Sequence, residues 1–104
     1  MTSLQQKVAQ YANQIEAEMR RIGMWQTQPL RPEQMAFKQA FAMDTMAFSQ
    51  WLQFIFLPRV RQAVESNSFP RSSSVGAQAV REFDGDPEAD QLVTLLSEFD
   101  ALFA

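Results

Sequence analysis

Few side chains in this sequence are of the types that carry out catalysis. The 104 residues include no histidine and no cysteine, and so lack the commonest general base, the commonest metal ligand and the activated thiol. A serine nucleophile would need a lysine or carboxylate partner, yet Lys7 and Lys38 fall on the solvent side of amphipathic segments. We therefore interpret the run Ser72-Ser73-Ser74 as a loop and helix cap.

Acidic residues recur between Glu82 and Asp90 in a pattern that resembles a calcium-binding loop at first sight. Counted from Asp84, however, Ala89 occupies the position where such a loop requires glycine, and Leu95 occupies that of its terminal glutamate. A turn followed by the charged start of a helix accounts better for these carboxylates. The three glycines are isolated, so we expect no phosphate-binding loop. The sequence predicts no metal site, no cofactor and no enzymatic activity.

The charges are divided unevenly along the chain. Residues 1–81 hold all nine Lys and Arg against five acidic residues, a net charge of +4, whereas residues 82–104 hold seven acidic residues and no basic one. One interpretation is a basic body that binds nucleic acid and an acidic segment that regulates it. The interpretation we favour is an acidic last helix that packs beside the arginines and forms salt bridges with them.

Binding to a partner is the kind of function that the remaining features favour. Seven arginines and two lysines suit bidentate contacts to phosphate or carboxylate groups, but a pI near 4.8 makes RNA the weaker partner hypothesis. Six methionines could form an adaptable contact surface, although methionine at helical spacing more often fills a core. The candidate partner-binding residues are Trp25, Gln50, Gln53, Phe54, Leu57, Arg59 and Arg61.

Helices must position these residues, and the first helix is the clearest. Apolar residues recur at three- and four-residue steps from Leu4 to Ile22, which predicts an amphipathic helix over residues 3–23. Ser3 and Gln6 have the spacing of a capping box, and Gly23 is typical of a helix end.

A second, more apolar helix is predicted over residues 45–66, with Asp44 or Thr45 as its cap. An unbroken helix would place Arg59 in the middle of the apolar face, so the phase must change, and we expect Pro58 to break the helix there. Phe54 and Leu57 lie off the main apolar stripe. Burial of both is favoured, because a helix that is apolar on most sides is usually enclosed; the alternative is that they line a groove or a partner surface.

Weaker patterns predict helices over residues 74–83 and 86–103 and a short turn near 33–40. The predicted fold class is all-α, a single helical domain over residues 1–104 that forms a four-helix bundle-like array with a proline break in the central helix. The first residues lack the features of a signal peptide, and the longest apolar run is too short to cross a bilayer. We expect a cytoplasmic protein with no membrane partner.

One stretch resembles the signature of a known family. Its residues are Phe41, Asp44-Thr45-Met46, Phe48-Ser49-Gln50-Trp51-Leu52-Gln53-Phe54-Ile55-Phe56 and Leu57-Pro58-Arg59. They are similar to those of the YqcC-like family of small bacterial all-helical proteins. The resemblance extends from the first helix to the last, and implies a four-helix bundle-like domain from a bacterial cytoplasm. It also implies that family genes often lie next to one for a tRNA pseudouridine synthase, and it brings no catalytic residues.

The function that we expect is a non-enzymatic helical interaction or accessory module, which either self-associates or serves a partner protein. The alternative is an RNA-associated accessory factor linked to pseudouridylation of tRNA, which would bind RNA through Arg59, Arg61 and neighbouring arginines. A hydrolase or transferase that uses carboxylates alone is least favoured, because no pair of carboxylates can be assigned to a shared cleft.

Overall fold

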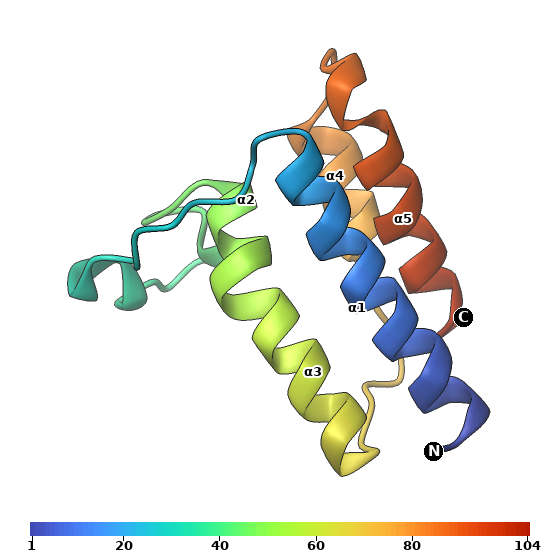
Figure 1. The fold of residues 1–104 in the computed structure, drawn as a ribbon. Helices are drawn as coiled ribbons and strands as arrows, with labels where there is room; N and C mark the ends of the chain where they lie inside the picture. The colour runs from blue at the N-terminus through green and yellow to red at the C-terminus, as the bar shows by residue number, and fades with distance from the viewer.

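The chain folds into helices only, as a computed structural model that describes all residues 1–104 shows (Figure 1). The predicted all-α class is confirmed. The prediction of four main helices is confirmed as well, since α2, η3 and α3 follow one another without a gap and together form one central helix. The α-helices are α1 (Ser3–Arg21), α2 (Phe48–Trp51), α3 (Leu57–Ser66), α4 (Val75–Glu82) and α5 (Asp90–Ala101). The shorter elements are η1 (Pro32–Met35), η2 (Ala40–Ala42), the π-helical η3 (Leu52–Phe56) and η4 (Pro87–Ala89).

Helix α1 lies at the centre of the arrangement, with α3 on one side and α5 on the other, and α4 packs against α5 (Figure 1). The apolar faces of these helices meet in one core of 20 buried residues. Its largest fully buried side chains include Ile15 and Met19 from α1, Leu52 and Leu57 from the central helix, and Leu92 from α5. Burial of these faces is the main source of stability in a domain of this size.

The capping box of α1 begins one residue earlier than predicted. Thr2 is the last extended residue, and its Oγ1 accepts a hydrogen bond from the Gln5 N–H while Gln5 Oε1 accepts one from the Thr2 N–H. Ser3 is therefore already helical. At the other end Gly23 has a φ of 77°, a left-handed conformation that glycine adopts without steric cost, as the sequence predicts.

The phase change in the central helix occurs in a π-turn before Pro58. The Leu57 N–H donates to the carbonyl of Leu52, five residues back, and the extra residue rotates the following side chains by about 100°. Val60 and Val64 thereby reach the buried face, and Pro58, which has no N–H to donate, falls in the first turn of α3. The expected break thus takes the form of a wide turn inside a continuous helix.

The predicted cap of the central helix was wrong. Ala47 occupies the cap position, and Gln50 Oε1 accepts its N–H. The carboxylate of Asp44 instead accepts the N–H groups of Lys38 and Gln39. Residues 24–47 form an arm beside the helices, in which the short turn predicted near 33–40 takes the form of two 3₁₀ turns, η1 and η2 (Figure 1).

Helices α4 and α5 approach each other closely at Gly76. The carboxylate of Asp100 on α5 accepts the N–H groups of Val75 and Gly76 and the hydroxyl of Ser73, and so caps the start of α4 from another helix. Ser74, which stands at the cap position, makes no side-chain cap bond. No helix of the structure has the length and apolarity that crossing a membrane requires.

Candidate functional site

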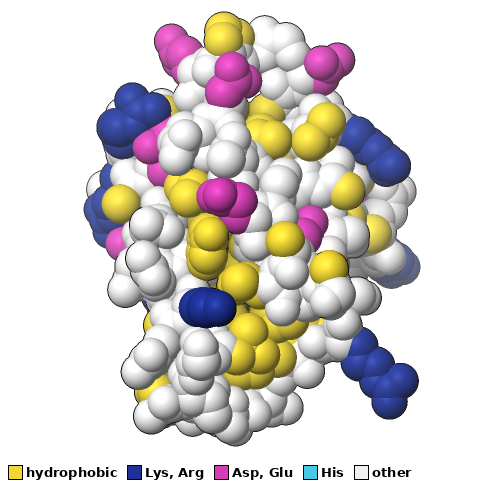
Figure 2. Space-filling model, turned by 90° about the vertical axis from the view of Figure 1, so that its right-hand side faces the viewer, with side chains coloured by type: hydrophobic (Ala, Val, Ile, Leu, Met, Phe, Trp, Pro, Cys, Tyr) yellow, Lys and Arg dark blue, Asp and Glu magenta, His cyan; other side chains and the backbone are white.

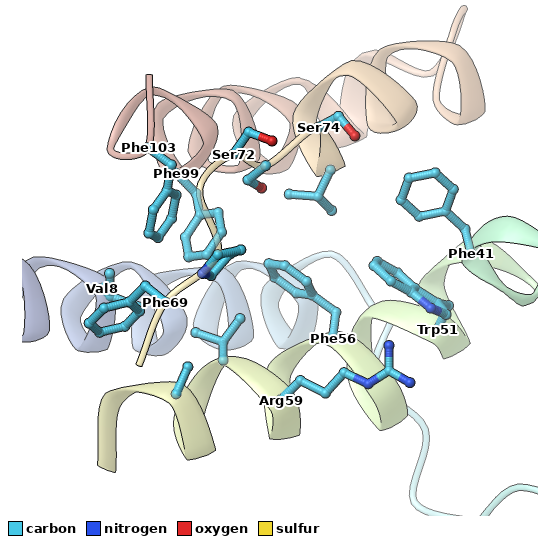
Figure 3. A pocket seen from close by; sticks show the side chains of 15 residues that line it. Val8, Phe41, Trp51, Phe56, Arg59, Phe69, Ser72, Ser74, Phe99 and Phe103 are labelled. Carbon is cyan, nitrogen blue, oxygen red and sulfur yellow. The ribbon is translucent and has the colours of Figure 1, made fainter. Parts of the chain in front are cut away.

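A cavity of about 430 Å³ opens between α3, α5 and the connector that joins α3 to α4 (Figure 3). Ten of its 15 lining residues are hydrophobic. Its floor includes Val60 and Ala63 of α3, and the connector contributes Pro70 and the serine run. A concave, mainly apolar space of this volume with a few polar groups is typical of a ligand-binding site.

Six aromatic rings form the wall of this cavity, and each lies beside the next. The ring centroids are 4.9 Å apart for Phe41 and Trp51, 5.5 Å for Trp51 and Phe56, and 5.2 Å for Phe56 and Phe99. Phe103 extends the row at 5.3 Å from Phe99, and Phe69 ends it at 6.1 Å from Phe103. Trp51, Phe56 and Phe99 are buried, whereas Phe41 at one end of the row and Phe103 and Phe69 at the other are half-buried.

Arg59 is the only charged residue that lines the cavity. Its side chain is exposed, and it takes part in none of the four ion pairs of the structure. Figure 3 shows that it extends from α3 toward the Trp51 end, across the cavity from Ser72 and Ser74. These two exposed hydroxyls form no hydrogen bond within the chain. The cavity therefore combines an aromatic wall with an unpaired positive charge and free hydroxyl groups.

Two backbone features that cost free energy border the same cavity. Phe41 and Ala42 have φ values of 57° and 53°, in the left-handed region that non-glycine residues seldom adopt. The π-helical η3 carries Phe56 into the cavity wall. Such features persist where surrounding contacts hold them in place, and they occur often at functional sites.

Gln50 and Gln53, two of the predicted partner-binding residues, hold the arm against the central helix. The buried amide of Gln53 accepts the Gln26 N–H at 3.0 Å and donates to the Gln26 carbonyl at 2.8 Å. Gln50 Nε2 donates to the side-chain carbonyl of Gln26. Both side chains thus have structural partners within the chain.

Phe54 and Leu57, for which the sequence allowed either burial or a partner surface, lie in different environments. Leu57 is fully buried, so the expectation of burial is confirmed for it. For Phe54 the favoured burial is wrong, because this side chain is half-buried and is not part of the core cluster or of the residues packed against it. Trp25 is half-buried beneath the guanidinium of Arg20, whose Cζ lies 4.6 Å from its ring centroid.

The predicted salt bridges between the arginines and the acidic last helix are wrong. Every ion pair lies within residues 1–81, and Arg61 donates to Glu16 of α1 at 2.7 Å. The reason is that α3 faces α1, so the acidic residues within its reach belong to the first helix. Partial burial raises the pKa of Glu16, but hydrogen bonds from Arg20 and Arg61 outweigh it and leave that pKa below its usual value.

The carboxylates of residues 82–104 take part in no ion pair. Those from Glu82 to Asp90 lie around the turn between α4 and α5, whereas that of Asp100 lies at the start of α4. In Figure 2 most acidic side chains of the face shown lie in its upper half, while an apolar patch lies in the lower half. The upper end is where the turn between α4 and α5 lies in Figure 1. No three His, Asp or Glu residues are grouped in a way that could hold a metal ion.

Arg59 is a candidate binding residue from the sequence, whereas the cavity beside it is not predictable from the sequence. Its aromatic wall comes from the arm, the central helix, the connector and the carboxy-terminal segment with α5. No local spacing signals that residues more than 60 positions apart will form one wall. The contribution of the serine run was also missed.

Comparison with known proteins places the chain among bacterial proteins. Residues 7–102 match the model of the DUF446 family, which is described as "tRNA pseudouridine synthase C". An uncharacterized protein of Haemophilus influenzae is 30% identical over 103 residues, which cover 95% of this chain and 94% of that protein. The uncharacterized protein YqcC of Escherichia coli is 29% identical over 92 residues, which cover 86% and 84% of the two chains.

A third relative differs in length. The tRNA pseudouridine synthase C of Pectobacterium carotovorum is 38% identical over 73 residues, which cover 67% of this chain but only 19% of that protein. Most of the longer protein therefore lies outside the similarity. No solved structure matches the chain.

Proposed function

This chain belongs to the DUF446 family, and from that premise we propose that it is a non-enzymatic helical interaction module whose partner is a tRNA pseudouridine synthase. The observation that carries the proposal is the relative named tRNA pseudouridine synthase C, in which the similar segment makes up only 19% of the polypeptide. A module that is covalently joined to a larger protein meets it at a high effective concentration. A module on a separate chain must replace that linkage by affinity for the same partner.

The side chains around the cavity support binding rather than catalysis. Arg59 is the only titratable residue in its lining, and a guanidinium remains protonated at any physiological pH. It can hold an anion, but it cannot accept a proton from a substrate. Two of the relatives that match most of this chain carry the description "uncharacterized protein", so the non-enzymatic assignment remains our proposal.

The half-buried Phe54 is the residue we assign to the partner surface. It lies on the central helix and outside the core, and aromatic residues are enriched where proteins bind each other. Pro58, four residues further along the same helix, is exposed. Together they offer a rigid apolar contact that needs little ordering on binding.

The test is association with the tRNA pseudouridine synthase of the same genome. Both proteins are co-expressed, and size-exclusion chromatography with light scattering is expected to show a complex of one copy of each. Phe54→Ala should weaken that complex by about tenfold or more, whereas Glu65→Gln, an exposed change on α3, should leave it intact. Two separately eluting proteins would reject the proposed partner, and a stable dimer of this chain alone would favour self-association.

A second candidate is an accessory factor that binds RNA. It is favoured by one observation, namely that Arg59, Arg71 and Arg81 take part in no ion pair. Arg71 follows Pro70 and precedes Ser72, both of which line the cavity. A titration with bulk tRNA at low salt tests this candidate, since contacts to phosphate depend strongly on salt.

A further inference from the structure

We propose that the aromatic cavity is a binding site for a small planar aromatic anion, a function that goes beyond the association with a partner protein. The site consists of the six-ring wall, the apolar floor on α3 and Arg59 at the mouth. The proposal concerns a free organic molecule with a carboxylate, sulfonate or phosphate group. None of the relatives is described as binding one.

The wall determines the shape of the ligand. Neighbouring rings differ in orientation, with interplanar angles of 76° between Phe41 and Trp51, 30° between Trp51 and Phe56, and 75° between Phe56 and Phe99. Since Trp51, Phe56 and Phe99 are buried, a flat aromatic molecule would meet chiefly the half-buried rings of Phe41, Phe69 and Phe103. It can approach such rings with its face or its edge, and both arrangements are favourable. The cavity of about 430 Å³ falls within the range of sites that hold drug-sized ligands.

The charge of the lining determines the sign of the ligand. Arg59 is free of any carboxylate partner, and no Asp or Glu lines the cavity. Two lining residues, Ser73 and Val75, contact the carboxylate of Asp100. This carboxylate already accepts three hydrogen bonds, from Ser73, Val75 and Gly76. Its negative charge is therefore held at the start of α4. An anion bound beside the aromatic wall would meet a guanidinium that can form two parallel hydrogen bonds with it.

The polar groups opposite Arg59 give the site a second end. The exposed hydroxyls of Ser72 and Ser74 can donate to or accept from a further polar atom of the ligand. The site thus has a cationic end, an apolar middle and a neutral polar end. This arrangement favours molecules with one anionic group over dianions with charges at both ends.

The experiment uses two fluorescent probes that share one aromatic body. 8-Anilinonaphthalene-1-sulfonate carries an anionic group, and N-phenyl-1-naphthylamine is the same body without it. The wild-type chain is expected to bind the anionic probe with one saturable site, and at least about tenfold more tightly than the neutral one. Chemical-shift changes in ¹H–¹⁵N spectra should be confined to residues that line the cavity, such as Ala63 and Ser73.

Three variants assign the binding to this cavity. Arg59→Gln should weaken the anionic probe by about tenfold and leave the neutral probe unchanged. Ala63→Phe, which fills the floor of the cavity, should weaken both probes by about tenfold or more. Arg81→Gln removes another unpaired arginine, outside the cavity lining, and should change neither. A wild-type thermal transition in each variant shows that the probes report on the folded protein.

The proposal is overturned if the wild-type chain binds both probes equally or binds neither. It is also overturned if Arg59→Gln leaves the preference for the anionic probe intact. If Ala63→Phe fails to fold, the comparison of Arg59→Gln with Arg81→Gln decides, because both of these residues are exposed. All of these outcomes are independent of whether a pseudouridine synthase binds the chain.

Discussion

Arg59 and Arg61 differ in their surroundings although they are two positions apart on α3. Side chains at that spacing point to different sides of a helix. Arg61 reaches Glu16 on α1 and donates to its carboxylate, whereas Arg59 lies at the cavity with no acidic partner. The sequence marks both as candidates for binding, but only the packing of α3 against α1 determines which guanidinium is neutralised.

Phe54 and Ile55 offer a direct comparison of an edge residue with a core residue. Ile55 is 5% exposed and belongs to the core cluster, while Phe54 is half-buried outside it. We expect Ile55→Ala to lower the free energy of unfolding by about 2–5 kcal/mol through loss of buried surface and the cavity left behind. Phe54→Ala should cost clearly less. Urea denaturation of both variants measures the difference, and equal large losses would place Phe54 in the core.

The ion pair of Glu18 makes the free energy of unfolding depend on pH in the acidic range. A hydrogen bond from the Arg21 guanidinium lowers the pKa of Glu18 below its usual 4.5, against the opposite effect of burial. Because the unfolded chain has the higher pKa, the stabilisation is fully present above pH 4.5 and is lost as the pH falls through the lowered folded value.

We expect Glu18→Gln to reduce the free energy of unfolding at neutral pH and to make its decline in acid shallower. Denaturation curves at several pH values between about 7 and 3 test this. Glu65→Gln is the matched control, since Glu65 is exposed and forms no ion pair. If the free energy of unfolding of Glu18→Gln falls with pH in parallel with that of the wild type, the ion pair between Glu18 and Arg21 has no such role.

At the scale of elements, the periodicity of apolar residues was sufficient to locate the four main helices. It also revealed that the phase of the central helix must change near Pro58. It could not reveal how, because a kink and a π-turn shift the later side chains to a similar extent. The hydrogen bond from Leu57 to Leu52 distinguishes them. The cap of α4 was beyond sequence reasoning, since Asp100 lies 25 positions from Val75 and on another helix.

Gly76 fixes the distance between α4 and α5. A Cβ built at this position would lie 2.6 Å from the Cα and 2.7 Å from the N of Ser97, and backbone atoms cannot move aside as a flexible side chain can. At a helical position with free space around it, replacing glycine by alanine would raise the free energy of unfolding by about 0.5–1 kcal/mol. Here we expect Gly76→Ala to destabilise by about 1–3 kcal/mol, because the two helices must separate.

Thermal denaturation of Gly76→Ala beside Ala77→Gly checks this expectation. Ala77 is the next residue of α4 and is exposed, so its change to glycine reports helix propensity alone, at a cost of about 1 kcal/mol. A Gly76→Ala variant that melts at or above the wild-type temperature would show that α4 and α5 can move apart without cost.

At the scale of the whole molecule, the cavity arises from segments that only the tertiary fold brings together. Phe41 comes from the arm, Phe69 from the connector, and Phe103 from the turn that follows α5. Phe41 and Phe69 lie outside the predicted helices, and nothing in the local sequence links either of them to Phe103. The same applies to charge. The sequence shows that basic residues are confined to residues 1–81 and that residues 82–104 are acidic, but not that ion pairs form only within residues 1–81.

This division of charge leads to a prediction about RNA. Counterion release makes the logarithm of the binding constant fall with the logarithm of salt concentration, with a slope of about −0.7 to −0.9 per neutralised phosphate. If tRNA binds at low salt, Arg59→Gln should reduce that slope by about one. Arg61→Gln should leave it nearly unchanged, because Glu16 already holds that guanidinium. The seven carboxylates of residues 82–104 form no ion pair, and their negative charge opposes the binding of RNA. Fluorescence titrations over about 0.02 to 0.2 M salt measure the slopes. An absence of binding at the lowest salt concentration would eliminate RNA as a partner. Equal effects of the two substitutions would show that the ion pair between Arg61 and Glu16 opens in the complex.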